Sequence, residues 1–220
     1  MTDSLNTNET NIHVSEEKAL KHASNKNPLV WIDCEMTGLN IEVDELIEVA
    51  VIITDSDLNI LDPGISVVIN PGEKALHNMN DFVTEMHTNS GLINELSTGI
   101  KIRDAEKVIL DYVKKFVPEP KKALLSGNSI ATDKMFLVKQ MPELIDYLHY
   151  RIVDVSTIKE LAKRWFPRVY YHIPLKEGNH RALADIRESI TELCYYRETI
   201  FPSGRGPSSE ECVKISSKFS

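Results

Sequence analysis

Three runs of aliphatic and β-branched residues in the first third of the chain predict three strands. The runs are Leu29–Asp33, Leu46–Thr54 and Ile65–Ile69. The turn-forming segments Asp55-Ser-Asp and Asp62-Pro-Gly separate them. Because the runs follow one another closely, we expect them to form an antiparallel meander.

Beyond residue 100 the apolar pattern changes from the period of a strand to the period of a helix. Arg103–Phe116 has apolar residues at positions 105, 108, 109, 112, 113 and 116, which form one helical face. Short strands and helices then alternate: we expect strands at Ala123–Leu125 and Arg151–Val153, and helices after Gly127, at Ser156–Trp165 and within His180–Ile200. This order predicts an α/β fold with a central mixed sheet flanked by helices.

The two ends of the chain differ from this domain in composition. Residues 1–27 are polar, and we expect a disordered extension with a short helix at Ser15–His22. Residues 202–220 are rich in Ser, Gly and Pro, and we expect a disordered tail. The ordered domain is predicted to span 28–201.

Composition and charge limit the class of partner. Of the 220 residues, 42% are hydrophobic and 26% charged, as is usual for a globular domain, and the net charge is −8. A long nucleic acid is held by many Lys and Arg contacts to phosphates, so this charge argues against such a partner, though not against a short anionic ligand held by metal ions. The three cysteines, and the lack of a signal, transit or membrane-spanning pattern, predict a cytoplasmic protein.

Two carboxylates stand where the first predicted strand ends. Asp33 and Glu35 point to the same side of an extended chain, and Cys34 points to the other. Adjacent carboxylates repel unless a cation lies between them, and Mg²⁺ and Mn²⁺ prefer oxygen ligands. The spacing alone is weak evidence, because Asp104 and Glu106 share it on a helix that we expect to be solvated. The rigid apolar strand before Asp33 strengthens the metal-site interpretation.

A second candidate motif is HRALAD, from His180 to Asp185. Five residues of helix turn through about 140° beyond one full turn, so these two side chains cannot share a face. We therefore expect Asp185 in the first turns of a helix and His180 on the loop before it. His149 and Asp154 have the same spacing along an apolar strand, which favours a structural interpretation there.

The third candidate is Asp133 in GNSIATD. The Gly-Asn-Ser segment supplies turn and N-cap residues, so Asp133 falls on or just after the first turn of the helix that follows. Taken alone, such an aspartate is typical of a carboxylate that interacts favourably with a helix dipole.

In this order, the three motifs resemble the DEDDh family of 3′→5′ exonucleases. The resemblance is closest to the branch that degrades oligoribonucleotides, and it spans about 29–201. It is carried by WIDCEMTGL, TDSDLNIL, EMHTNSGL, LLSGNSIATD, LHYRIVDVSTIKELAKRW and HRALADIRESI.

The resemblance implies an RNase-H-like fold, a homodimer and two divalent metal ions, Mg²⁺ or Mn²⁺. It implies hydrolysis of short RNA, down to dinucleotides, to nucleoside 5′-monophosphates. Asp33, Glu35 and Asp185 would hold one ion, Asp33 would bridge to the second ion, and Asp133 would assist there. His180 would be the general base, for which the unperturbed pKa of histidine is suitable.

The resemblance also implies substrate contacts. Leu39 would wedge against the 3′ base, His87 would contact the ligand, and Phe82 falls where many relatives have tryptophan. An alternative for Phe82 is an ordinary half-buried aromatic. The resemblance further implies a cap on the 5′-phosphate of the substrate, formed by Ser129, Arg151 and Ser156. Tyr150 matches a residue that reaches in from the partner subunit. For Ser156 the alternative is the N-cap of its helix, and both roles are compatible.

Three other functions remain open at this point. The chain could be another DEDDh exonuclease, acting on transfer RNA ends or on DNA. It could be a non-catalytic domain that binds signalling dinucleotides. The carboxylates could also be structural Ca²⁺ ligands.

Overall fold

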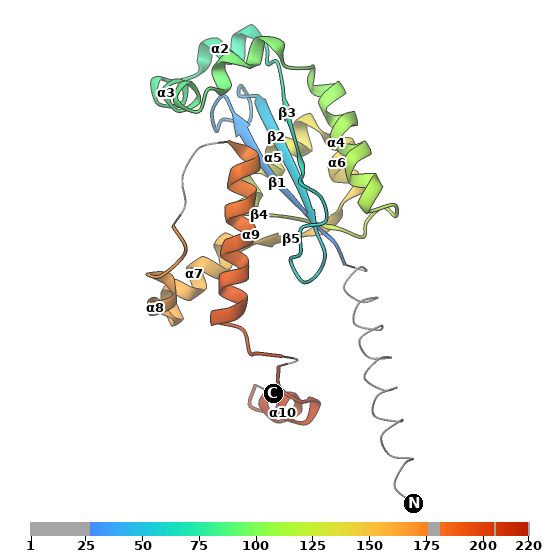
Figure 1. Cartoon of the computed structure of the whole chain (residues 1–220), viewed down its shortest axis with the longest axis vertical. Coiled ribbons are helices and arrows are strands. Elements are labelled where there is room, and N and C mark those ends of the chain that lie inside the picture. The colour runs from blue at the N-terminus through green and yellow to red at the C-terminus, as the bar shows by residue number, and fades with distance from the viewer. Residues whose placement is uncertain (1–26, 176–180, 205, 220) are drawn as a thin grey trace, which may run out of the picture.

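A five-stranded mixed sheet forms the centre of the molecule in the computed structural model, which describes residues 27–175, 181–204 and 206–219 (Figure 1). The order of the strands is β3-β2-β1-β4-β5. β1 pairs antiparallel with β2, β2 antiparallel with β3, and β4 lies parallel to both β1 and β5. The strands are β1 (Leu29–Met36), β2 (Leu46–Thr54), β3 (Ile65–Val68), β4 (Leu124–Gly127) and β5 (His149–Asp154). The predicted α/β fold with a mixed sheet and an initial meander is confirmed.

Helices cover both faces of this sheet. The longer helices are α4 (Ile102–Phe116), α5 (Ile130–Gln140), α7 (Val155–Trp165) and α9 (Ala182–Thr199). The shorter ones are α2 (Glu73–Asn78), α3 (Asp81–Asn89), α6 (Pro142–Tyr147), α8 (Pro167–Tyr170) and α10 (Ser209–Ser216), with 3-10 turns at Leu92–Asn94 and Leu96–Thr98. Apolar residues of α4, α5 and α6 share one core cluster with the sheet, and those of α7 and α9 share a second.

The alternation of side chains along β1 determines which layer each residue faces. Ile32 and Cys34 are buried in the cluster with α4 and α5, while Trp31 is buried in the cluster with α9. Asp33 and Glu35 therefore share the face of Trp31, the face that α9 covers. Cys34 points to the opposite side, as the sequence predicted.

β1 continues three residues further than the sequence indicated. The predicted strand ended at Asp33, whereas the observed strand ends at Met36, because pairing with β2 continues as Asp33↔Ala50 and Glu35↔Glu48. The parallel pairing with β4 is confined to residues 29–31. Asp33 and Glu35 therefore lie on a rigid strand, at the part of its length that β4 leaves uncovered.

The predicted disordered tail contains a short helix, α10. Ser208 accepts a hydrogen bond from the Glu211 backbone N–H, and the Glu211 carboxylate accepts one from the Ser208 N–H, which forms a capping box. α10 buries none of its residues, so local capping rather than packing accounts for it. The predicted extension, with its helix at Ser15–His22, lies outside the described residues except for Asn27. None of the described helices is long and apolar enough to span a bilayer.

Candidate active site

Three carboxylates from two elements converge on the face of the sheet beneath α9. Asp33 and Glu35 come from β1, and Asp185 comes from the first turn of α9. One oxygen from each lies within 4.8 Å of the others. The sequence placed Asp185 in the first turns of a late helix, and the structure confirms that placement. His180 itself lies outside the described residues.

Asp133 approaches the same group from the opposite side of β1. Its side chain is buried on α5, and its Oδ1 accepts a hydrogen bond of 3.0 Å from the Cys34 backbone N–H. That contact lies beyond the stretch of β1 that pairs with β4. Asp133 thus fixes the segment of β1 that carries Asp33 and Glu35, which an exposed helix-dipole carboxylate would not do.

Burial raises the pKa of each of the three carboxyl groups on β1 and α5, and the charges of neighbouring carboxylates raise it further. Burial raises the pKa of Asp33 well above its usual value, and the charges of Asp133, Glu35 and Asp185 raise it further. Burial, followed by the charge of Asp185, raises the pKa of Glu35 to about 8. Burial raises the pKa of Asp133 to about 6, although hydrogen bonds from backbone N–H groups oppose the shift. Such a donor set of clustered carboxylate oxygens fits a hard divalent cation, which would relieve this repulsion.

Buried Glu48 and half-buried Arg181 form an ion pair beside these carboxylates, and sequence reasoning missed both. Glu48 lies directly opposite Glu35 on β2, is 1% exposed, and bonds to Arg181 through Oε1 at 3.1 Å. Arg181 also bonds to Glu95 at 2.8 Å. Since Arg181 immediately precedes α9, this pair anchors the start of the helix that carries Asp185. The signal in the sequence was a single charged residue in the apolar run LIEVAVIIT.

His87 joins α3 to the end of β1. Its side chain is fully buried, its Nε2 lies 2.9 Å from the Met36 carbonyl oxygen, and its Nδ1 lies 3.9 Å from Glu35 Oε2. The structure thus places the predicted ligand-contacting histidine against Glu35, at the inner end of α3. Phe82 lies in the first turn of the same helix and is 75% exposed, so the half-buried alternative is wrong.

The loop between β1 and β2 presents Leu39, which is 75% exposed. Asp44 closes this loop by accepting hydrogen bonds from the Thr37 hydroxyl at 3.0 Å and the Asn40 N–H at 2.8 Å. Gly38 allows the close approach of Asp44, because a Cβ at position 38 would lie 2.4 Å from Asp44 Oδ2. The glycine at position 38 thus has a specific steric cause.

The two serines of the predicted phosphate cap meet at the junction of β4, β5 and their helices. Ser129 Oγ lies 3.0 Å from Ser156 Oγ, and the Ser129 N–H donates to Ser156 Oγ at 2.9 Å. Asp154 Oδ1 accepts from the backbone N–H groups of both serines, at 2.9 and 3.0 Å. Ser129 has a left-handed backbone, with φ of 52°, which is uncommon for a residue with a side chain. Asp154 is the N-cap of α7, so the N-cap alternative for Ser156 is wrong.

Arg151 and Tyr150 lie on β5, at the edge of the sheet. The Arg151 Nε donates to the Tyr150 hydroxyl at 3.1 Å, and the Tyr150 side chain is 72% exposed. Both residues are therefore accessible to a ligand or to another subunit.

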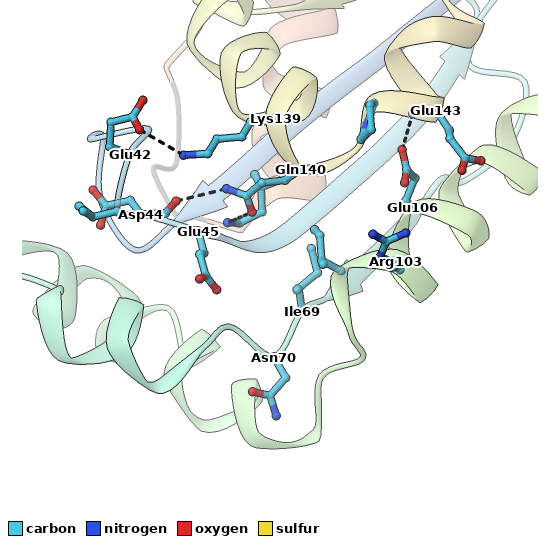
Figure 2. A pocket seen from close by; sticks show the side chains of 14 residues that line it. Glu42, Asp44, Glu45, Ile69, Asn70, Arg103, Glu106, Lys139, Gln140 and Glu143 are labelled. Atoms are coloured by element: carbon cyan, nitrogen blue, oxygen red, sulfur yellow. Dashed lines mark hydrogen bonds and ion pairs between the residues drawn. The ribbon is translucent and has the colours of Figure 1, made fainter.

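A pocket of about 500 Å³ is lined by residues of the loop between β1 and β2 and of α4, α5 and α6, and it contains none of the predicted site residues (Figure 2). Its charged lining is mainly acidic: Glu42, Asp44, Glu45, Glu106 and Glu143 against Arg103 and Lys139. Glu106, which we expected to be solvated, is buried and accepts the Glu143 and Leu144 N–H groups at the start of α6. Gln140 bonds to Asp44 O and to the Leu46 N–H, so this region braces the Leu39 loop.

Comparison with known proteins agrees with this geometry. A sequence profile of the exonuclease family matches residues 30–193. Among solved structures, exonuclease I from Methylocaldum szegediense superimposes with a TM-score of 0.60 at 17% identity, over 79% of this chain. A zinc-bound E. coli exonuclease I–single-stranded DNA complex gives 0.62 at 12% identity, over 80% of this chain. The chain spans 41% of the length of each of these two structures, and the likeness shows the fold. The family profile, together with the clustered carboxylates, identifies a metal-dependent exonuclease.

Relatives of similar length specify the branch. An oligoribonuclease from Leifsonia xyli is 60% identical over 86% of this chain and 91% of its own length. An oligoribonuclease from Streptomyces griseus is 56% identical over 87% of this chain and 96% of its own. The chain belongs to the oligoribonuclease family of exonucleases.

Proposed function

We propose that this exonuclease hydrolyses short oligoribonucleotides from the 3′ end, down to dinucleotides, and releases nucleoside 5′-monophosphates. The observation that carries the proposal is the pair of features on one face: a cluster of carboxylates, and a serine pair held by Asp154. The family relationship supports the substrate class, since the relatives are named oligoribonucleases.

The carboxylates are the proposed ligands of two divalent ions, Mg²⁺ or Mn²⁺. Asp33, Glu35 and Asp185 would hold the first ion, and Asp33 and Asp133 would serve the second. Bound there, such ions supply an activated water for attack on phosphorus and stabilise the leaving 3′-oxygen. Burial and then the charge of Asp185 raise the pKa of Glu35, so a bound cation would favour the charged form of this group, which supports a role as a ligand.

His180 is the proposed general base. It precedes Arg181, which is anchored to Glu48 and Glu95, and it is five residues before Asp185. His180→Ala should lower turnover by about 10²–10⁴-fold, the usual contribution of a general base, with the fold intact. Unchanged single-turnover rates at saturating metal would remove His180 from the mechanism.

The remaining side chains would bind the two ends of a short substrate. Leu39 and Phe82 are exposed apolar groups suited to packing against bases at the 3′ end, and His87 supports the site beside Glu35. Ser129, Arg151 and Ser156 would close over the 5′-phosphate. A longer chain would have to pass its next phosphodiester through this cap, which accounts for a preference for short fragments.

The assembly that we propose is a homodimer through the edge strand β5. An edge strand offers unpaired backbone groups, and Tyr150, Met135 and Val138 are exposed on β5 and the neighbouring α5. In that arrangement Tyr150 would complete the cap of the partner's site. The cytoplasmic location stays a prediction from the sequence.

The test is metal-dependent product release from labelled RNA of two, three, five and ten nucleotides. Fast conversion of the dinucleotide to mononucleotides, slowing with length, is the expected result. A preference for the longest strand would instead favour another exonuclease branch, with the same carboxylates but no functional cap. Tight binding of dinucleotides without turnover in Mn²⁺ would favour a non-catalytic role.

A further inference from the structure

Asn128 lies between the predicted cap and helix α9, and none of the sequence motifs assigned it a role beyond the turn. Its side-chain Nδ2 lies 2.9 Å from Ser189 Oγ and 3.2 Å from Glu192 Oε2, both on α9. On its other side, Ser156 Oγ donates to Asn128 Oδ1 at 3.1 Å. One amide group therefore connects the cap to the helix that carries Asp185.

Glu192 fixes which way this amide points. The Glu192 side chain is 1% exposed and is surrounded by donors: Lys159 Nζ at 2.9 Å, the Tyr196 hydroxyl at 3.1 Å and Asn128 Nδ2. A carboxylate only accepts hydrogen bonds, so the NH₂ of Asn128 must face Glu192 and its oxygen must face Ser156. The amide has one orientation that satisfies both sides.

This orientation determines the roles of the two cap hydroxyl groups. Ser156 has a single hydroxyl proton, and Asn128 Oδ1 accepts it. In the short contact between the two serines, Ser129 is therefore the donor and Ser156 the acceptor. The Ser129 hydroxyl can turn toward a phosphate oxygen without breaking the bond between Ser156 and Asn128.

The same link spans the distance between the cap and the carboxylates. Ser189 Oγ, which accepts from Asn128, itself donates to the backbone oxygen of Asp185 at 2.9 Å. The loop with Ser129 and the turn with Asp185 are thus joined through two consecutive hydrogen bonds. A substrate that contacts both the cap and the metal ligands must match the fixed separation between them. This arrangement therefore selects one substrate length.

We propose that Asn128 is a positioning residue for the 5′-phosphate cap, oriented by Glu192, and that it sets the preference for 5′-phosphorylated dinucleotides. The proposal rests on the proposed function, since it assumes that Ser129 and Ser156 bind the terminal phosphate. It concerns a residue that would touch neither the metal ions nor the scissile phosphate.

The experiment compares two substrates, pApA and ApA, which differ only in the 5′-phosphate. In Asn128→Ala, kcat/KM for pApA should fall by about tenfold, the order expected when a hydrogen bond to a charged group is misdirected. The value for ApA should stay close to that of the unmodified enzyme. Glu192→Gln preserves the shape of the side chain but no longer imposes a single orientation on the Asn128 amide. This variant should also reduce the ratio of kcat/KM for pApA to kcat/KM for ApA.

Tyr196→Phe is the matched control. It removes a different hydrogen bond to Glu192 and leaves the Asn128 side unchanged, so the pApA to ApA ratio should not move. If Asn128 had a merely structural role, Asn128→Ala would lower kcat/KM equally for pApA and ApA. This outcome would overturn the proposal. If the unmodified enzyme shows no preference for pApA over ApA, the proposed cap is wrong. If it shows this preference and both Asn128→Ala and Glu192→Gln retain it, the cap stands and only the role of Asn128 is wrong.

Discussion

At Asp33, burial and the repulsion of neighbouring carboxylates both act against a negative charge. Its pKa is raised first by burial and then by Asp133, Glu35 and Asp185. Asp33→Asn removes that charge at constant shape. We therefore expect the metal-free variant to be more stable than the unmodified chain, by roughly 1–2 kcal/mol or a few degrees in Tm. Activity and metal binding should be nearly abolished.

Thermal unfolding in EDTA and in Mn²⁺, together with calorimetric metal titration, checks this expectation. Asp104→Asn is a matched control, because Asp104 belongs to the other Asp-x-Glu pair and lies outside the carboxylate cluster. Two tight metal sites surviving in Asp33→Asn would contradict the bridging role of Asp33.

The pH dependence of stability follows from the neighbouring Glu35 and Asp133. Their folded-state pKa values are raised from 4.5 to about 8 and from 3.8 to about 6. A carboxyl with a raised pKa holds its proton more tightly when folded. The stability that it contributes is therefore complete below its unfolded pKa and is lost as pH rises through the folded value.

The metal-free enzyme should accordingly have a higher Tm at pH 6 than at pH 8. The gain in Tm on adding Mg²⁺ should be larger at pH 8, because the ligands must be deprotonated to bind an ion. Glu35→Gln should flatten the metal-free dependence. A metal-free Tm that rises from pH 6 to pH 8 would mean that other groups control stability in this range.

At the scale of elements, the loop from Thr37 to Glu45 depends on one close approach. In Gly38→Ala the new methyl group would lie 2.4 Å from Asp44 Oδ2, so Asp44 must move and release Thr37 and Asn40. We expect a loss of about 1–3 kcal/mol in stability, as for other overpacked sites, and a higher KM because Leu39 is displaced.

Gly72→Ala is the control for this loop. Its Cβ would meet only the flexible Glu45 side chain, at 3.4 Å, and its φ of −66° suits any residue. Dinucleotide kinetics and chemical unfolding of both variants distinguish a loop effect from a general one. An unchanged KM in Gly38→Ala would separate Leu39 from substrate binding.

The elements that the sequence predicted well are those whose pattern is local. The run Leu46–Thr54 matches β2 at both ends, since nine consecutive residues are buried and turns flank them. Helices α2 and α3 were not predicted: they are short, with six and nine residues, and α3 is held to β1 by His87, which is distant in sequence. The capping box of α10 was visible in the sequence as Ser208 and Glu211, but the composition of the tail obscured it.

The residues of the site also divide into those that a local sequence pattern predicts and those that it does not. Alternation along β1 and the helical position of Asp185 placed three of the carboxylates correctly. The support around them comes from residues distant in sequence: Arg181 and Glu48 are 133 residues apart, and Asn128 and Glu192 are 64 apart. Asp154 was interpreted as structural, and it is, but the structure that it maintains is the Ser129–Ser156 pair. Such pairings depend on the packed fold, which no local pattern encodes.

At the scale of the whole molecule, the net charge of −8 limits how strongly the protein can hold a polyanion. A dinucleotide offers few phosphates, so few counterions are released on binding. We expect KM for a dinucleotide to change little between low and moderate salt. A steep dependence in a kinetic salt titration, like that of a protein that tracks long strands, would count against a short-fragment enzyme.

The proposed homodimer implies that each active site needs a residue from the partner subunit. Tyr150 is exposed on edge strand β5, and the proposed homodimer places it in the partner's cap. Tyr150→Ala should then lower dinucleotide turnover while leaving the fold and the metal-induced gain in Tm intact. Asp33→Asn should be inactive for the independent reason given above.

Mixing Tyr150→Ala, whose turnover is lowered, with the inactive Asp33→Asn under conditions that allow subunit exchange gives a direct test. In a mixed dimer, the chain with Tyr150→Ala retains Asp33 and receives Tyr150 from its partner, so one of the two sites is complete. Random assortment predicts recovery of about a quarter of the unmodified activity, because half of the dimers are mixed and each has one intact site. If Tyr150 instead serves its own chain, no site in any dimer is complete and the mixture stays inactive. Mixing Asp33→Asn with Asp185→Asn should also stay inactive if each chain supplies its own carboxylates, and this control separates subunit complementation from contamination by unmodified enzyme.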